Sequence, residues 1–128
     1  MVIDSSAVIA ILLDEPERRA LNEKIEADQT RLVSVVSYVE AALVIESRLG
    51  EAGGRELDLL LHRAEVELTP VDLDQAEIAR DAFRRFGRGR HPAALNFGDC
   101  FAYALAKTTG EPLLFKGNDF SRTDIVAA

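Results

Sequence analysis

The residues best suited to chemistry in this sequence are a few carboxylates that lie far apart along the chain. Four of the 22 acidic residues either follow a short apolar segment or lie near the start of an expected helix: Asp4, Glu40, Asp99 and Asp119. In open parallel sheets, ligands bind beyond the carboxyl ends of the strands, and residues that follow strands gather there. We therefore expect these four side chains to meet at one edge of a sheet.

The surroundings of two of these acids predict burial. Asp4 lies between the apolar pair Val2-Ile3 and the apolar run 7–13, and Asp99 lies between Phe97 and Phe101. Buried carboxylates that gather must take up protons or bind a cation. An all-oxygen set without neighbouring cysteines or paired histidines suits Mg²⁺ or Mn²⁺ rather than Zn²⁺. Such ions leave positions for water and phosphate oxygens; one ion can activate a water as a nucleophile, and a second can stabilise the leaving oxygen in an in-line displacement. The alternative is that these acids only stabilise helix starts through the helix dipole.

The charge of the chain is unevenly distributed. The net charge of −7 disfavours nucleic acid on average. Four arginines nevertheless fall within one short segment: Arg84, Arg85, Arg88 and Arg90. This segment is either a local contact for a phosphodiester backbone or a solvated arginine-rich loop.

Length and composition limit the class of protein. The 128 residues, 48% apolar and 29% charged, predict one globular domain that spans residues 1–128. The single cysteine, Cys100, excludes a disulfide framework and is expected to be a packed, unreactive helix residue. The longest apolar run, residues 7–13, is too short to span a bilayer, and no secretory signal is apparent, so we expect a cytoplasmic protein.

The apolar pattern alternates between short strands and helices. It predicts strands at 2–3, 31–34, 66–69 and 112–115, a final edge strand at 125–126, and helices at 7–13, 16–27, 37–50, 52–64, 72–86 and 96–110. Ser37 and Asn96 are the expected N-caps of two of these helices, and Val39, Leu43 and Leu49 are expected to face inward. This order predicts an α/β fold, a three-layer α/β/α sandwich around a short, mainly parallel sheet.

Four segments of the sequence together resemble a known family. They are Val-Ile-Asp-Ser-Ser-Ala at 2–7, Ser-Tyr-Val-Glu at 37–40, Asn-Phe-Gly-Asp-Cys at 96–100 and Phe-Lys-Gly-Asn-Asp-Phe at 115–120. They resemble a PIN domain, and more narrowly a VapC-type toxin of a bacterial toxin–antitoxin pair. The resemblance implies an endoribonuclease that depends on Mg²⁺ or Mn²⁺, acts on RNA, often forms a homodimer and is neutralised by a VapB-type antitoxin.

The resemblance also implies roles for individual residues. By position, Asp4 and Asp99 match the principal metal-binding aspartates of the family, and Glu40 and Asp119 match the other acids of the site. The last acid shifts in register among relatives, so Asp124 is an alternative to Asp119.

Two further residues match supporting positions of the family. Ser6 matches a hydroxyl that orients Asp4 or a metal-bound water, and Asn96 matches an asparagine that caps its helix and fixes Asp99. For Asn96, a purely capping role is an equal alternative.

Two other functions remain open at this point. A receiver-like phospho-accepting signalling domain has a similar length and a lysine after a late strand, as Lys116 stands here, but Asp4 lacks the neighbouring second acid that such a domain needs. A PIN domain that binds RNA without cleaving it is the other alternative, against which the full set of acids argues.

Overall fold

A short parallel sheet forms the centre of the protein. The computed structural model describes residues 1–128, with strands β1 (Val2–Ile3), β2 (Leu32–Ser34), β3 (Glu67–Thr69) and β4 (Leu113–Leu114) in the order β3-β2-β1-β4. All three neighbouring pairs are parallel, and Val2 is in register with both Leu32 and Leu113. The chain therefore adds β2 and β3 on one side of β1 and returns to its other side with β4. This reversal of strand order puts the carboxyl ends of β1 and β4 side by side.

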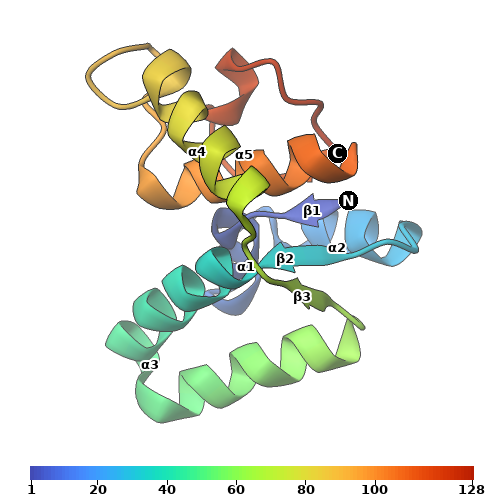
Figure 1. Cartoon of the computed structure of the whole chain (residues 1–128). Helices are drawn as coiled ribbons and strands as arrows, with labels where there is room; N and C mark the ends of the chain where they lie inside the picture. The colour runs from blue at the N-terminus through green and yellow to red at the C-terminus, as the bar shows by residue number, and fades with distance from the viewer.

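Helices cover both faces of this sheet (Figure 1). They are α1 (Ser5–Leu12), α2 (Arg18–Ala27), α3 (Val35–Arg63), α4 (Leu73–Phe86) and α5 (Phe97–Thr109), with a 3₁₀ turn η1 (Phe120–Arg122) near the end of the chain. Alternate strand residues point to opposite faces. Ile3 and Leu114 pack into a core with α1, α2 and α3, whereas Val2 and Leu113 pack into a second core with α4 and α5. The predicted three-layer α/β/α arrangement is thus confirmed.

Helix α3 contains the two helical segments that the sequence predicts, joined at Gly50. Gly50 has φ of 67° and ψ of −164°, a conformation that side-chain-bearing residues avoid. The chain reverses direction there (Figure 1), so that the second half of α3 runs back beneath the sheet.

The predicted start of α3 is wrong by a few residues. Ser34, not Ser37, is the N-cap, because its hydroxyl accepts a hydrogen bond from the backbone N–H of Val36 at 3.3 Å. Ser37 instead lies inside the helix and is buried.

The predicted inward face of α3 is also wrong. Val39 and Leu43 are 52% and 65% exposed, and Leu49 is 50% exposed. In the first half of α3, the buried positions are Ser37, Ala41 and Ile45. Small side chains allow α3 to pack closely, and residues two positions away point about 200° around the helix, toward the outside.

The predicted strand at 125–126 is reduced to a single bridge between Leu113 and Ala127. Likewise, the helix predicted from residue 16 begins at Arg18, with Glu17 as its N-cap. None of the helices combines the length and the apolar composition needed to cross a membrane.

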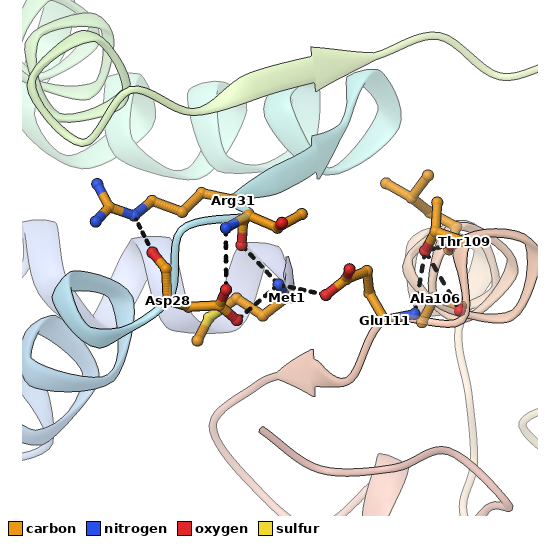
Figure 2. Close-up of polar contacts among 8 residues, drawn as sticks. Met1, Asp28, Arg31, Ala106, Thr109 and Glu111 are labelled. Carbon is orange, nitrogen blue, oxygen red and sulfur yellow. Dashed lines mark hydrogen bonds and ion pairs between the residues drawn. The ribbon is translucent and has the colours of Figure 1, made fainter.

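The amino group of Met1 ties the start of β1 to neighbouring segments (Figure 2). It donates to Asp28 Oδ2 at 2.9 Å, to the carbonyl oxygen of Thr30 at 2.6 Å and to Glu111 Oε2 at 2.8 Å. The hydrogen bond from this amino group lowers the pKa of Asp28. These contacts hold the segments before β2 and β4 against β1, which fixes the amino-terminal ends of all three strands.

Candidate active site

Asp4 follows β1 directly and is the most buried acid of the molecule. It is 1% exposed and caps α1, since its Oδ2 accepts a hydrogen bond from the backbone N–H of Ser6 at 3.0 Å. Its Oδ1 is buried without a hydrogen-bond partner. Burial raises the pKa of Asp4, the charge of Asp119 adds to this, and hydrogen bonds from Ser5 and Ser6 oppose it. An acceptor oxygen left unpaired in the interior is a suitable ligand for a cation.

Glu40 lies in the second turn of α3 and reaches the same edge of the sheet. Its Oε1 accepts a hydrogen bond from Ser5 Oγ at 3.2 Å. Burial and the charge of Asp4 raise the pKa of Glu40. The carboxylate also lies against Gly98 in the first turn of α5, where an added Cβ would overlap its oxygens. Gly98 therefore gives Glu40 the space to approach Asp99, a role that our sequence analysis missed.

Asp99 is held by a reciprocal cap at the start of α5. Its backbone N–H donates to Asn96 Oδ1 at 2.9 Å, and its Oδ2 accepts from the backbone N–H of Asn96 at 3.0 Å. Asn96 is thus the predicted N-cap, and it fixes the Asp99 side chain. Burial raises the pKa of Asp99 to about 7, with further contributions from the charges of Asp4, Asp119 and Glu40. The four carboxylates predicted from the sequence therefore act on one another electrostatically.

The structure favours Asp119 over Asp124 as the fourth acid. Asp119 is exposed just before η1, and its charge raises the pKa of both Asp4 and Asp99. Asp124 instead accepts hydrogen bonds from the Tyr103 hydroxyl at 2.7 Å and from Lys107 Nζ at 2.9 Å. Desolvation raises the pKa of Asp124, but these hydrogen bonds outweigh it, and the pKa lies below its usual value.

Ser6 joins the first helix to the segment after β4. Its hydroxyl accepts a hydrogen bond from the backbone N–H of Lys116 at 3.0 Å, which brings that segment beside Asp4. The Lys116 side chain pairs with Glu15, and its Nζ is 3.3 Å from Glu17 Oε2. The Lys116 side chain therefore pairs with Glu15 and Glu17 and with none of the four acids.

The donor set fits a divalent cation in its chemistry. It consists of carboxylate oxygens, one of them buried and unpaired, and three of the carboxyl groups have raised pKa values. A cation would remove the repulsion that raises these values and would leave room for water and phosphate oxygens. No three acidic, histidine or cysteine side chains are close enough to form a compact cage as they stand.

The arginine cluster divides into two kinds of side chain. Arg85 lies 3.7 Å from Asp81 and 3.6 Å from Asp124, so it belongs to an ion-pair network. Arg84, Arg88 and Arg90 are exposed and form no ion pair. Only these three are free to meet phosphates.

Cys100 lies directly after Asp99, yet it is not part of this chemistry. It is buried, and burial together with the charge of Asp99 raises the pKa of its thiol to about 11. The predicted unreactive role is consistent with this environment, because the thiolate is disfavoured.

Comparison with known proteins identifies the family. The PIN domain profile matches residues 1–126, and the chain belongs to the PIN-domain family. Its sequence relatives are VapC ribonucleases. Ribonuclease VapC30 of Mycobacterium tuberculosis strain H37Rv is 61% identical over 125 residues, which cover 98% of this chain and 95% of that protein. Ribonuclease VapC of Mycolicibacterium smegmatis is 61% identical over 127 residues, which cover 99% of this chain and 98% of that protein.

Solved structures agree in fold. The crystal structure of Mycobacterium tuberculosis VapC20, described as a sarcin-ricin loop cleaving toxin, superposes with a TM-score of 0.81 at 15% identity and covers 99% of this chain and 97% of that one. A toxin–antitoxin complex from Klebsiella pneumoniae gives a TM-score of 0.72 at 17% identity, and the match covers 99% of this chain and 95% of that one. With the PIN family established, the receiver-like alternative is wrong.

Proposed function

We propose that this chain is the endoribonuclease toxin of a VapBC-type toxin–antitoxin pair and that it hydrolyses RNA with Mg²⁺ or Mn²⁺. The observation that carries the proposal is the unpaired, buried Oδ1 of Asp4 within a set of carboxylates that act on one another at the carboxyl ends of β1 and β4. The VapC relatives, which are named as ribonucleases, support RNA as the substrate.

Asp4 and Asp99 would hold the cation, which supplies a Lewis acid that acidifies water and neutralises charge on the phosphate. Ser6 orients Asp4 through its backbone N–H, and Asn96 orients Asp99 through the reciprocal cap. Glu40, whose pKa is raised and whose Oε1 is held by Ser5, is suited to take a proton from the attacking water. Asp119 adds negative charge at the exposed rim of the site.

A VapB-type antitoxin and a second copy of this chain are the partners that we propose for the domain of residues 1–128. A solved toxin–antitoxin complex with the same fold supports the antitoxin. An open cavity of about 440 Å³ between α1, α2 and the two halves of α3 is lined by both apolar and charged side chains, among them Ile11, Leu60 and Arg63. This mixed lining suits an amphipathic segment of the antitoxin.

The test is cleavage of single-stranded RNA by the purified chain with Mn²⁺, with Mg²⁺ and with EDTA. Asp4→Asn and Asp99→Asn should each lose activity by about a hundredfold or more, since even the supporting partners of metal ligands are worth about 10- to 100-fold. Both variants should also lose the rise in melting temperature that the metal gives the wild type. Asp124→Asn is the matched control and should keep its activity and its metal response.

Full activity in excess EDTA would refute the metal mechanism. RNA binding and metal binding without any cleavage would instead favour the alternative of a PIN domain that only binds RNA.

A further inference from the structure

Lys116 connects two segments that border the acidic site. It lies between β4 and Asp119, and its backbone N–H donates to the Ser6 hydroxyl at 3.0 Å. Its side chain reaches the segment between α1 and α2, where it pairs with Glu15 and its Nζ lies 3.3 Å from Glu17 Oε2. The segment that carries Asp119 is thus attached at two points, to α1 through the backbone and to the segment after α1 through a side chain.

The side chain of Asp119 does nothing to fix its own position. It is exposed and accepts no hydrogen bond at the start of η1. On one side, the chain turns at Gly117, which has φ of 100°. On the other side, Phe120 is buried and its ring packs against Phe115, with centroids 5.2 Å apart. The place of the Asp119 carboxylate therefore depends on how the two ends of this short segment are held, at Lys116 and at Phe120.

The place of Asp119 affects the other acids. Burial raises the pKa of Asp4 and of Asp99, and the charge of Asp119 raises both further. A lysine beside such a site would by its charge alone repel a metal ion. Two carboxylates face the single ammonium group of Lys116, however, so the ion pairs keep it from presenting a free positive charge to an incoming cation.

We propose that Lys116 is a positioning residue for Asp119: its ion pairs with Glu15 and Glu17 hold the segment after β4 in place, and this fixes the Asp119 carboxylate at the acidic site. The inference rests on the proposed function, because that site is the one proposed to hold Mg²⁺ or Mn²⁺. Residues that orient the groups around a metal are worth about 10- to 100-fold in metal affinity. Exposed ion pairs add little to stability, so the effect of Lys116 is on the placement of Asp119 rather than on the fold.

Direct contact between Lys116 and an RNA phosphate is the competing role. It would require the ammonium group to leave both glutamates. The two roles predict different effects when Glu15 and Glu17 are replaced together. A phosphate contact predicts stronger RNA binding, because Lys116 is released, whereas positioning of Asp119 predicts weaker metal binding and unchanged RNA binding.

The test is the affinity of the chain for Mn²⁺ without RNA, measured by isothermal titration calorimetry. Lys116→Met keeps the aliphatic part of the side chain and should weaken Mn²⁺ binding about tenfold, although the loss of a positive charge would by itself strengthen it. Lys116→Arg can form both ion pairs and should keep the affinity. Lys107→Met is the matched control, because Lys107 is 38% exposed against 37% for Lys116 and pairs with Asp124, outside the site. It should leave the affinity unchanged.

Two further variants test the route through Asp119. Glu15→Gln with Glu17→Gln leaves Lys116 in place and should weaken Mn²⁺ binding as much as Lys116→Met does. In the Asp119→Asn background, Lys116→Met should have no further effect, because the two residues act as one unit. With RNA, kcat of Lys116→Met should fall at limiting Mn²⁺ and recover at saturating Mn²⁺, and RNA affinity in EDTA should not change.

The opposite results would overturn the inference. Unchanged or tighter Mn²⁺ binding by Lys116→Met would show that Lys116 acts through its charge alone, and a further loss in the Asp119→Asn background would show that it does not act through Asp119. Weaker RNA binding in EDTA with unchanged Mn²⁺ affinity would assign Lys116 to a phosphate. If Lys116→Met does not fold, the double glutamine variant decides.

Failure of the proposed function gives a different result. A wild type that binds Mn²⁺ and responds to these substitutions as described, yet cleaves no RNA, would refute the ribonuclease proposal and leave the positioning role standing. A wild type that binds no Mn²⁺ would refute both. Cleavage that depends on Mn²⁺, with Mn²⁺ affinity the same in all variants of Lys116, would refute the positioning role alone.

Discussion

Asp99 is costly to ionise in the folded, metal-free protein. Its folded pKa of about 7 lies above the ordinary 3.8, so the folded state binds the proton more tightly than the unfolded state. This tighter proton binding adds to the free energy of unfolding at low pH, and the contribution is lost as the pH rises from about 4 to about 7.

Asp99→Asn should therefore stabilise the metal-free protein above neutral pH. Asparagine can still accept the hydrogen bond from Asn96, and it removes the buried charge. We expect a gain on the order of 1 kcal/mol, allowing for solvent screening of a half-buried group, and no gain near about pH 4. Urea unfolding in EDTA at about pH 4 and about pH 8 measures it.

Asp124→Asn is the control for this prediction, and its effect on the stability of the protein at neutral pH should have the opposite sign. Its pKa is held low by hydrogen bonds from Tyr103 and Lys107, so its charge stabilises the fold at neutral pH and its removal should destabilise it. Equal effects of both substitutions would show that the four acids do not repel one another as described.

Gly98 determines where the carboxylate of Glu40 can lie. Gly98→Ala places a methyl group in the position of the Glu40 oxygens and should move Glu40 out of the site. We expect kcat to fall at least about tenfold while KM for RNA changes little, since the substitution displaces the proposed proton acceptor and leaves the proposed RNA contacts in place. Alanine in a helix is itself favourable, so the melting temperature should not report the defect.

A double variant separates displacement of Glu40 from other damage at Gly98. Glu40→Asp shortens the side chain by one methylene, so adding it to Gly98→Ala should recover part of the lost kcat. No recovery, with Glu40→Asp alone fully active, would mean that Gly98 acts in another way.

At the scale of elements, the reversal inside α3 depends on one glycine. Gly50 has a positive φ that alanine reaches only with strain, so Gly50→Ala should destabilise the protein by about 2 kcal/mol. Gly54 lies in regular helix, and the three atoms nearest to a Cβ added there all belong to the flexible Glu46 side chain. Gly54→Ala should be neutral or stabilising by up to about 1 kcal/mol. Thermal unfolding of both variants measures the difference, and equal effects would contradict the strain at Gly50.

Helices α3 and α5 show what sequence patterns can and cannot predict. The break at Gly50 in α3 and the cap Asn96 of α5 were predicted correctly, because a helix stop and a cap depend on local backbone chemistry. The inward face of α3 was predicted wrongly. The small residues Ser37 and Ala41 are buried, whereas a prediction based on the size of apolar side chains selects Val39 and Leu43, which are exposed.

The positions of the candidate acids could be predicted from the sequence for a related reason. Their positions after strands and at helix starts are local signals, as for Asp4 and Asp99. The contact between Glu40 and Gly98 joins residues far apart in sequence, and no local pattern encodes it. A glycine inside the first turn of α5, where it weakens the helix, was the available signal.

At the scale of the whole molecule, the topology places the acidic site and the unpaired arginines on different elements. Parallel strands in the order β3-β2-β1-β4 bring the ends of β1 and β4 together, which collects acids from α1, α3 and α5 at one edge. The unpaired arginines follow from α4 and the loop after it. RNA would then be held by the arginines while its phosphate approaches the acids, a contact that only a cation makes favourable.

Salt dependence tests this division. Each phosphate contact on a single strand contributes about 0.7 to the slope of log K against log salt, so Arg84→Ala with Arg88→Ala should reduce the slope by about 1.4. Arg85→Ala removes the same charge from a side chain already paired with Asp81 and Asp124, so it should leave the slope nearly unchanged and lower the melting temperature instead. Fluorescence anisotropy of a labelled single-stranded RNA, with the cleavage-deficient Asp99→Asn chain in a series of salt concentrations, measures the slopes. If Arg85→Ala changes the slope as much as each of the other two arginines does, the cluster acts only through its net charge, and the distinction between paired and unpaired side chains is wrong.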